Sequence, residues 1–445
     1  MGKIVNLAKL CQEFFGETAN NLSITTGFIK RQRKITGSAF LKAIVFGNMS
    51  DSNCSLDGMR NFLSEETIDI SAQGLDFRFT EVAVKFMQSM YEQCLKLFRN
   101  TMPLDCNILQ QFNSVKLLDS SHIILPANMA DMYKGCGACY KGRSSTVQSS
   151  LKLQVVFDYL NQSLDKVDIT EGIRADQGYR EHLSNISTKD LLISDLGYFV
   201  PASFIQIIEL GAYFISRYKA DTNIYDPITE EKIDLLNLLD NKFFLSKDVL
   251  LGKQAKVKLR IICHKLTDEQ AIGRRRKANL LAKSHKYKSS SRNQRLLDWS
   301  IFITNISEDM VNAEHIMIIY RARWQIELLF KLYKSHAKIE NLKGRSKPAR
   351  VLCELYGKLC SVLIFHGLSN CVELANDREI SLTKAFIELQ KRSRELFLSI
   401  TGRLNDLEQF LKKLIIDWGK FSLKDKYRKT RLSSLNTLKL LTIMA

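Results

Sequence analysis

Five polar side chains recur at helical spacing in the segment 313–339, which is otherwise rich in large apolar residues. With about 100° between successive residues of a helix, they share one stripe about 80° wide. They are Tyr320, Arg323, Glu327, Lys331 and Lys334. A mostly apolar helix is a buried one, so the stripe is predicted to line a cavity or groove. The alternative is a ladder of ion pairs at i,i+4 spacing, which is common on helices.

A carboxylate among three cations and a phenol suits the binding of a divalent metal ion beside phosphate oxygens. Mg²⁺ prefers carboxylate oxygens, and two such ions can stabilise both oxygens of an in-line displacement. Glu327 is insufficient alone, so further carboxylates are expected on strands. Asp119 follows the apolar run VKLL, and Asp195 follows LLIS. Taken singly, each is better explained as a strand-end or turn residue; together with Glu327 they favour a metal site.

The segments that must position Asp119 and Asp195 have the pattern of strands in a sheet. VKLLDSSHIIL (115–125), LKLQVVFDYL (151–160) and LLISDLGYF (191–199) are apolar runs bounded by Gly and Ser. DQGYREHLSNIS and VPASFIQIIELGA between and after them are predicted to be helices. Strands and helices in this order predict an α/β core in the middle of the chain.

Five regions are predicted along the chain, since 445 residues exceed one compact core. They are a helical N-terminal region (1–105), the first part of the core (106–220), a β-rich basic insertion (221–295), the second part of the core (296–375), and a helical C-terminal region (376–445).

Positive charge is concentrated in one part of the sequence. Lys and Arg number 65 against 47 Asp and Glu, and residues 251–300 hold 14 basic and only 3 acidic side chains. A single charge run is usually a solvated surface, but this clustering favours phosphate contact. The sequence has no run of about 18 apolar residues and no signal-peptide pattern, and its ten cysteines are scattered. We therefore expect a cytoplasmic protein with no membrane partner.

The residues Tyr320-x2-Arg323-x3-Glu327-x6-Lys334 match in full the YREK signature of bacterial insertion-sequence transposases of family four. LLDSSHIIL resembles that family's first catalytic Asp segment, and LLISDLGYF resembles the second. Trp299 in DWSIFITNI is similar to the tryptophan that precedes the signature helix. The resemblance covers roughly residues 110–360, and the first hundred and last seventy residues do not align by motif.

The resemblance implies an RNase H-like (retroviral-integrase-like) core with a mostly β insertion between Asp195 and Glu327. It implies cut-and-paste transposition, in which Asp119, Asp195 and Glu327 bind two Mg²⁺ (or Mn²⁺) ions and a DNA hairpin forms. The implied partners are the terminal inverted repeats, target DNA and a second copy of the chain, in the nucleoid of a bacterial cytoplasm. By role, the resemblance implies DNA binding by the N-terminal region (1–105) and possible dimerisation through the C-terminal region (376–445). The residues expected to contact DNA are Tyr320, Arg323, Lys331, Lys334, Trp299, Arg274, Arg275, Arg276 and Lys277.

Two other functions share parts of this pattern. An RNase H-like nuclease without strand transfer would need the same carboxylates, but it would need the phosphate-binding stripe less. A non-catalytic DNA-binding regulator derived from a transposase would not need an intact carboxylate set. Two residues also have a structural alternative: Trp299 as a core aromatic, and His122 as a strand residue that alternates away from Asp119.

Overall fold

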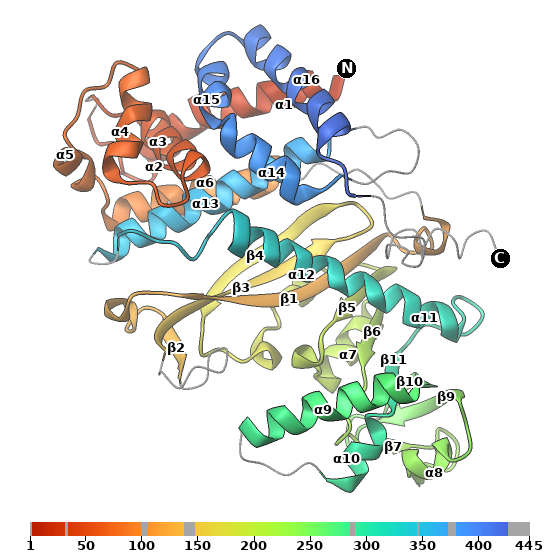
Figure 1. The fold of residues 1–445 in the computed structure, drawn as a ribbon. Helices are drawn as coiled ribbons and strands as arrows, with labels where there is room; N and C mark the ends of the chain where they lie inside the picture. The colour runs from red at the N-terminus through yellow and green to blue at the C-terminus, as the bar shows by residue number, and fades with distance from the viewer. Residues whose placement is uncertain are drawn as a thin grey trace.

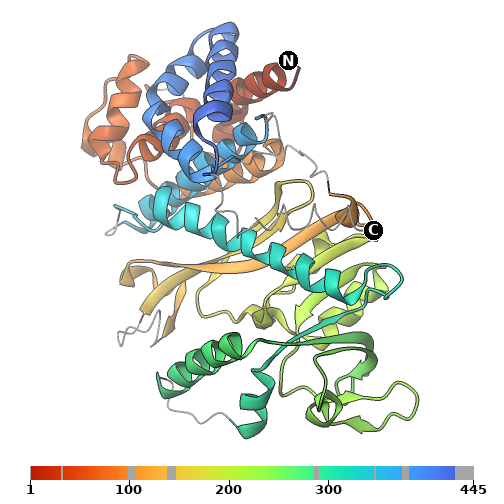
Figure 2. The same ribbon diagram turned by 45° about the vertical axis from the view of Figure 1, so that its right-hand side comes forward.

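The computed structural model of the chain describes residues 2–31, 34–98, 106–137, 147–284, 290–344, 347–372 and 380–425. A helical region lies on one side of a large sheet, and the segment predicted as an insertion lies at the far end of that sheet (Figures 1 and 2). In Figure 1 these parts follow one another from top to bottom.

The central sheet runs in the order β2-β3-β1-β5-β6-β11-β10-β9-β7-β8, with β4 paired to β3. β1 pairs antiparallel with β3 and parallel with β5, and β5 pairs parallel with β6. The order β4-β3-β1-β5-β6 is that of an RNase H-like core. The bounds are β1 (Ser114–Ile124), β2 (Lys134–Gly137), β3 (Val147–Asp158), β4 (Ser163–Glu171), β5 (Asp190–Ser194), β6 (Tyr213–Arg217) and β11 (Trp299–Thr304).

The strands that carry the predicted aspartates are buried on both faces. Every residue of β5 is buried, and so are the first five of β1. One face of the sheet is covered by α7 (Pro201–Glu209), and the other by α11 (Ala313–Tyr320) and α12 (Trp324–Lys331). Parallel strands covered on both faces have continuous apolar sequences, which explains the runs VKLL and LLIS.

The two ends of the chain form one helical body, because α1 packs against α16 and α13 packs against both α3 and α6. α13 thus belongs with this body, although its sequence falls within the predicted core region 296–375. The bounds are α1 (Gly2–Glu13), α2 (Ala19–Thr25), α3 (Gly37–Ser50), α4 (Leu56–Glu65), α5 (Ala72–Asp76), α6 (Glu81–Leu97), α13 (Pro348–Ser369), α14 (Leu382–Lys391), α15 (Ser393–Thr401) and α16 (Leu404–Phe421).

Helix α13 is long and apolar enough to cross a membrane by length and composition, but 94% of its most apolar window is buried inside the protein. It approaches α3 closely: a Cβ on Gly357 would lie 2.4 Å from Ile44 Cγ2. A helix buried in this way needs to be apolar around its whole circumference. We therefore interpret α13 as the core helix of the helical body.

Two buried polar residues of α13 join the helical body to the segment that follows α12. Lys358, 1% exposed, donates hydrogen bonds to the carbonyl oxygens of Ser52 (2.8 Å), Lys338 (3.0 Å) and Asn341. Glu354 accepts a hydrogen bond from the backbone N–H of Lys343 (2.7 Å). The segment after the signature helix is thus attached to the helical body through polar contacts inside the core.

Strands of the segment 221–295 extend the central sheet through the pairing of β10 with β11. Strands β9 and β10 lie where strands were predicted. The basic stretch, however, forms the 17-residue helix α9, so the insertion is not mostly β as predicted. The bounds are β7 (Ile224–Tyr225), β8 (Lys232–Ile233), α8 (Leu235–Leu239), β9 (Phe244–Leu251), β10 (Val257–Lys265), α9 (Asp268–Ser284) and α10 (Ser291–Leu296).

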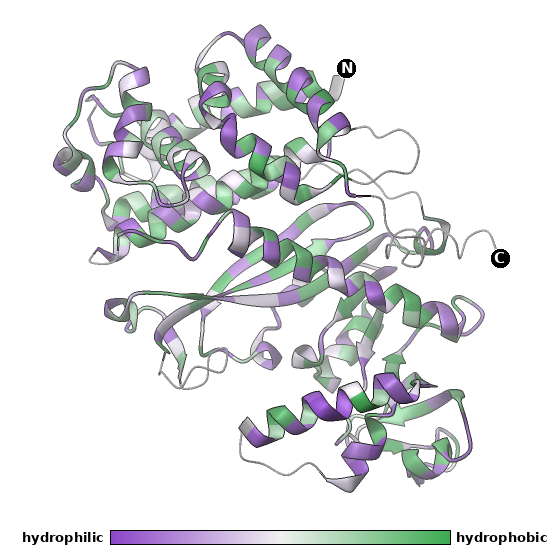
Figure 3. Cartoon of the chain, in the orientation of Figure 1, coloured by the Kyte–Doolittle hydropathy of each residue, from purple (hydrophilic) through white to green (hydrophobic). Residues whose placement is uncertain are grey.

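The sequence explains why α9 is helical. Arg, Lys, Ala and Leu are good helix formers, and Asp268 and Glu269 in the first turn and Lys283 in the last complement the helix dipole. Figure 3 shows α9 largely hydrophilic with scattered hydrophobic residues. By contrast, the predicted helix in DQGYREHLSNIS is wrong: short 3₁₀ turns form at Asp176–Gly178 and Glu181–Asn185. Gly, Ser and Asn in that segment are poor helix formers.

Candidate active site

The predicted helix over 313–339 is present, with irregular turns inside it. A 3₁₀ turn at Arg321–Arg323 separates α11 from α12, and a π turn covers Leu332–His336. α12 buries Ile326 and Leu329 on the sheet side, but Trp324 is 54% exposed and Leu328 39%. The expectation that most of its circumference is buried is therefore wrong. The helix is an outer layer lying across β1 (Figure 2), so one face remains in solvent.

The two predicted aspartates lie at neighbouring positions of adjacent parallel strands. Leu118 of β1 lies opposite Ser194 of β5, and Asp119 and Asp195 are the residues that follow them in the sequence. Asp195 directly follows the end of β5 and is the N-cap of the 3₁₀ turn Leu196–Tyr198. Glu327 comes from α12, which packs on β1.

The guanidinium of Arg323 lies between the carboxylates. Its Nη1 is 3.3 Å from Asp119 Oδ2, and its Nη2 donates to Glu327 Oε1. Burial on its own would lower the pKa of Arg323, but the nearby Tyr320, Asp195 and Glu327 raise it. Arg323 thus pairs with Asp119 and Glu327, which are 208 positions apart in the sequence, and the charge of Asp195 acts on it as well.

The pKa of the Asp119 carboxyl is raised to about 6, chiefly by burial. The backbone N–H of Ser120, 2.8 Å away, and Arg323 lower it, whereas Asp195 and Glu327 raise it. A nearby cation stabilises the ionised form of a carboxylate that is desolvated and close to other negative charges. Positive charge therefore stabilises the ionised carboxylates at this site.

Across the described ranges, no group of three or more His, Cys, Asp or Glu side chains is close enough together to hold a metal ion. The donor set nevertheless fits a hard divalent cation, because all three groups are carboxylates and their mutual repulsion is balanced by Arg323. A divalent ion would balance the same charge once the Arg323 side chain had moved aside.

The other residues of the stripe differ in their surroundings. The Tyr320 hydroxyl is 3.5 Å from the Ser194 carbonyl oxygen, and burial raises its pKa to about 12. Lys334 donates to the His122 carbonyl oxygen (2.6 Å) and pairs with Glu340 (2.8 Å). Lys331 is exposed. Tyr320 and Arg323 thus lie at the carboxylates, Lys334 lies further along β1, and Lys331 faces solvent.

His122 lies on the face of β1 opposite Asp119, as predicted. It sits across from Lys152 of β3. Burial and the Lys152 charge lower its pKa to about 4, although Asp176 opposes this shift. His122 is therefore neutral and separated from the carboxylates by the sheet.

Two tryptophans near the site have opposite exposures. Trp299, at the start of β11, is 8% exposed and packs in the apolar core on the far side of the sheet. Trp324 directly follows Arg323 and is 54% exposed. No role was predicted for Trp324 from the sequence; its position next to Arg323 was the available signal for it.

The four predicted cations of α9 fall into two pairs. Arg274 donates to the Trp299 carbonyl oxygen (2.9 Å) and to Ser300 Oγ (2.8 Å), and Arg275 pairs with Asp298 (3.2 Å). Arg276 and Lys277 are exposed. A shallow cavity of about 530 Å³ follows this helix, lined by Ile272, Arg275, Arg276, Asn279, Leu280 and Lys283. Arg276 and Lys277 are consequently the better placed for phosphate contact.

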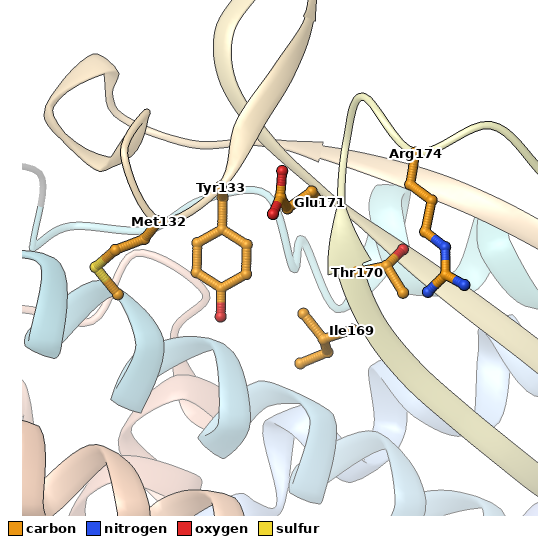
Figure 4. Close-up of a pocket in the computed structure, with 6 residues that line it drawn as sticks. All are labelled: Met132, Tyr133, Ile169, Thr170, Glu171 and Arg174. Carbon is orange, nitrogen blue, oxygen red and sulfur yellow. The ribbon is translucent and has the colours of Figure 1, made fainter. Parts of the chain in front are cut away.

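A second cavity, of about 660 Å³, lies at the end of β4 and contains none of the predicted site residues. Figure 4 shows the Tyr133 ring extending toward Ile169 of β4. Its Arg174 is already paired with Glu181 at 2.8 Å. The cavity is lined by Met132, Tyr133, Ile169, Thr170, Glu171 and Arg174.

Comparison with known proteins agrees with this geometry. Residues 110–364 match the family described as the Transposase DDE domain. The chain is 29% identical to the transposase for insertion sequence element IS1151 of Clostridium perfringens, over 98% of this chain and 97% of the relative. It is 27% identical to the transposase for insertion sequence element IS231B of Bacillus thuringiensis subsp. berliner, over 91% and 89%.

Because the family match covers more than half of its length, the chain belongs to the DDE transposase domain family. It is an enzyme that cleaves DNA and transfers the cut strands, so the resemblance to insertion-sequence transposases is confirmed. The family has an RNase H-like fold and generally depends on divalent metal ions. Its members are typically soluble cytoplasmic proteins.

Proposed function

We propose that Asp119, Asp195 and Glu327 hold two Mg²⁺ ions, or Mn²⁺ in their place, and that the chain moves its DNA element by cut-and-paste transposition through a hairpin. The observation that carries this proposal is that Arg323 pairs with both Asp119 and Glu327, while the charge of Asp195 acts on Asp119 and on Arg323. When bound, such ions supply activation of the attacking oxygen and stabilisation of the leaving 3′ oxygen.

The chain's own residues then position the DNA. Arg323, once it no longer balances the carboxylates, presents a guanidinium that binds a phosphate with two hydrogen bonds. The Tyr320 hydroxyl, whose pKa is raised to about 12 by burial, is protonated and can donate a hydrogen bond. Lys331 and Lys334 add positive charge along the same strand of DNA.

Formation of a hairpin bends the backbone sharply, and displacing a base relieves the bend at a cost of a few kcal/mol. Stacking on an aromatic ring recovers about 1–3 kcal/mol. Trp299 is the residue that the resemblance assigns to this role, whereas Trp324 is the exposed ring beside Arg323. We propose that both take part, with Trp299 leaving its core position.

Trp324→Ala is expected to lower the rate of hairpin formation about fivefold to a hundredfold while the free energy of unfolding changes little, because the ring is exposed. Trp299→Ala should slow the same step but also reduce stability by about 3–5 kcal/mol, because it leaves a cavity. Nicking and hairpin formation are measured separately on labelled terminal DNA, with urea unfolding alongside. Equal loss of nicking and hairpin formation in either variant would contradict its stacking role.

The exposed cations of α9, Arg276 and Lys277, are expected to contribute to DNA binding. The double substitution Arg276→Ala and Lys277→Ala should weaken DNA binding and reduce the slope of log K against log salt by about 2, since each phosphate contact contributes about 0.9. Filter binding over a range of salt concentrations measures this slope. Lys391→Ala, exposed in the helical body, is the control, and a slope unchanged by the double substitution would remove α9 from the DNA interface.

The decisive test is incubation of the protein with the inverted repeats that flank its own gene, in the presence of Mg²⁺. Hairpin-ended products are expected, followed by insertion into a second DNA. Nicked or blunt ends without joining would instead favour a nuclease that does not transfer strands. The proposal also includes two copies of the chain in the complex with paired ends, at the nucleoid, and cross-linking of that complex tests the stoichiometry.

A further inference from the structure

A buried polar cluster lies behind the carboxylates, on the opposite face of the sheet. Neighbouring residues of a strand point to opposite faces, so Ser120 points away from the face on which Asp119 meets Arg323. Ser120 lies across from Gln154 on β3. The cluster consists of Ser120, Lys152, Gln154, Asp176 and Tyr198, of which Gln154 is 0% exposed and Lys152 and Tyr198 are 5% exposed.

On the Asp119 side, the cluster is joined to the carboxylate by a single residue. The Ser120 hydroxyl donates to Asp176 Oδ1 at 3.0 Å, while the Ser120 backbone N–H donates to Asp119 Oδ1 at 2.8 Å. Lys152 Nζ donates to the same Asp176 oxygen at 3.0 Å and to the Arg174 carbonyl oxygen at 2.7 Å. Asp176 thus anchors the residue that orients the Asp119 side chain.

On the Asp195 side, the anchor is Tyr198. Its backbone N–H donates to the Asp195 carbonyl oxygen at 3.0 Å, and its hydroxyl donates to Gln154 Oε1 at 2.6 Å. The same turn also rests against Asp176: a Cβ on Gly197 would lie 3.1 Å from Asp176 Oδ2. The turn that begins at Asp195 is therefore held to β3 and to Asp176.

Buried polar groups are costly unless they are hydrogen-bonded, yet this cluster is placed where both catalytic strands meet. Within the part of the chain that the structure describes, Gln154 Nε2 has no hydrogen-bond partner. The Tyr198 hydroxyl donates to Gln154, and the Asp176 carboxylate accepts from Ser120 and Lys152. The bonds made by Ser120 and by Tyr198 fix the backbone next to Asp119 and Asp195.

We propose that Tyr198, Gln154 and Asp176 are positioning residues for metal binding, which fix the distance between Asp119 and Asp195 from behind the sheet. The proposal rests on the proposed function, because it assumes that these carboxylates hold the metal. Metal ligands need partners that hold them in the productive geometry, and loss of such a partner typically costs 10–100-fold in metal affinity.

Tyr198→Phe removes the hydroxyl that reaches Gln154 and keeps the buried ring. We expect it to raise the apparent Kd for Mn²⁺ about tenfold, measured on the full chain without DNA by titration with electron paramagnetic resonance. DNA binding without metal should stay unchanged, and excess Mn²⁺ should restore the cleavage rate. Gln154→Leu removes the other partner of the same bond and should have the same effect.

Tyr179→Phe is the matched control. Tyr179 is a buried tyrosine on the same face, 1% exposed, and its hydroxyl donates to Asp168 Oδ2 at 2.7 Å without touching either catalytic turn. It should bind Mn²⁺ like the unchanged protein. Equal loss of affinity in Tyr179→Phe and Tyr198→Phe, or none in Tyr198→Phe, overturns the inference.

Asp195→Asn separates this inference from the proposed function. It should abolish Mn²⁺ binding at the site. If the unchanged protein bound no Mn²⁺, or if Asp195→Asn bound it normally, the metal site itself would be contradicted and the inference with it. If Asp195→Asn lost the ion and Tyr198→Phe kept full affinity, only the positioning role would fall.

Discussion

Asp119→Ala is expected to reduce strand cleavage at least about a thousandfold while DNA binding stays largely intact. The carboxylate is the one group of β1 that reaches Arg323 and the proposed ions, and metal ions contribute several kcal/mol to the stabilisation of such a transition state. Each 1.36 kcal/mol corresponds to a factor of ten in rate. Cleavage of labelled terminal DNA measures the loss, and a gel-shift assay on the same DNA measures binding.

The charges of Arg323 and Glu327, which the substitution leaves in place, explain why DNA binding should survive the loss of Asp119. Without Asp119, Arg323 keeps Glu327 as its partner and has more freedom to bind phosphate, so binding should not weaken. Asp131→Ala, an exposed aspartate in the loop before β2, serves as the control. Loss of binding together with cleavage, or a lowered unfolding midpoint, would indicate a structural role for Asp119 instead.

Lys358→Ala is expected to lower the free energy of unfolding by about 3 kcal/mol or more. The ammonium group is 1% exposed and donates to three carbonyl oxygens from two segments, and each buried acceptor left without a donor costs about 1–3 kcal/mol. Burial lowers the pKa of Lys358 to about 8, so the measurement belongs at pH 7 or below, where the group is charged.

Urea unfolding followed by circular dichroism gives this free energy. Lys391→Ala, on the surface of α14, should change it by less than about 0.5 kcal/mol. Strand cleavage should also fall in Lys358→Ala, because the segment that Lys358 holds contains Glu340, the partner of Lys334. A decrease of less than about 1 kcal/mol in the free energy of unfolding would contradict the prediction, because it would mean that water satisfies the three carbonyl oxygens in place of the lysine.

The strands and the helix that carry Asp119, Asp195 and Glu327 were predicted from the sequence, because these residues interrupt strongly apolar runs. It could not predict that Arg323 lies between Asp119 and Glu327, since that contact joins residues 204 positions apart. The exposure of Trp324 and Leu328 was also missed, because helical periodicity does not say how many faces of a helix are covered. The RNase H-like core is supported by the family match, whereas the assigned roles of the individual site residues remain proposals.

Tertiary packing also decided the organisation outside the core. The terminal regions have ordinary amphipathic patterns, and nothing in them says that α1 packs against α16. The basic stretch of α9 was interpreted by its charge, and its helix propensity was overlooked. By contrast, the face of β1 on which His122 lies was predicted from strand alternation alone.

The strands β10, β9, β7 and β8 continue the same sheet that carries Asp119 and Asp195. Helix α9 is held to β11 through Arg274. On the proposed role of α9, the distance between the scissile bond and the phosphates that this helix binds is therefore set by backbone pairing. On that proposal, DNA of the wrong helical phase would have to twist to reach both the active site and α9.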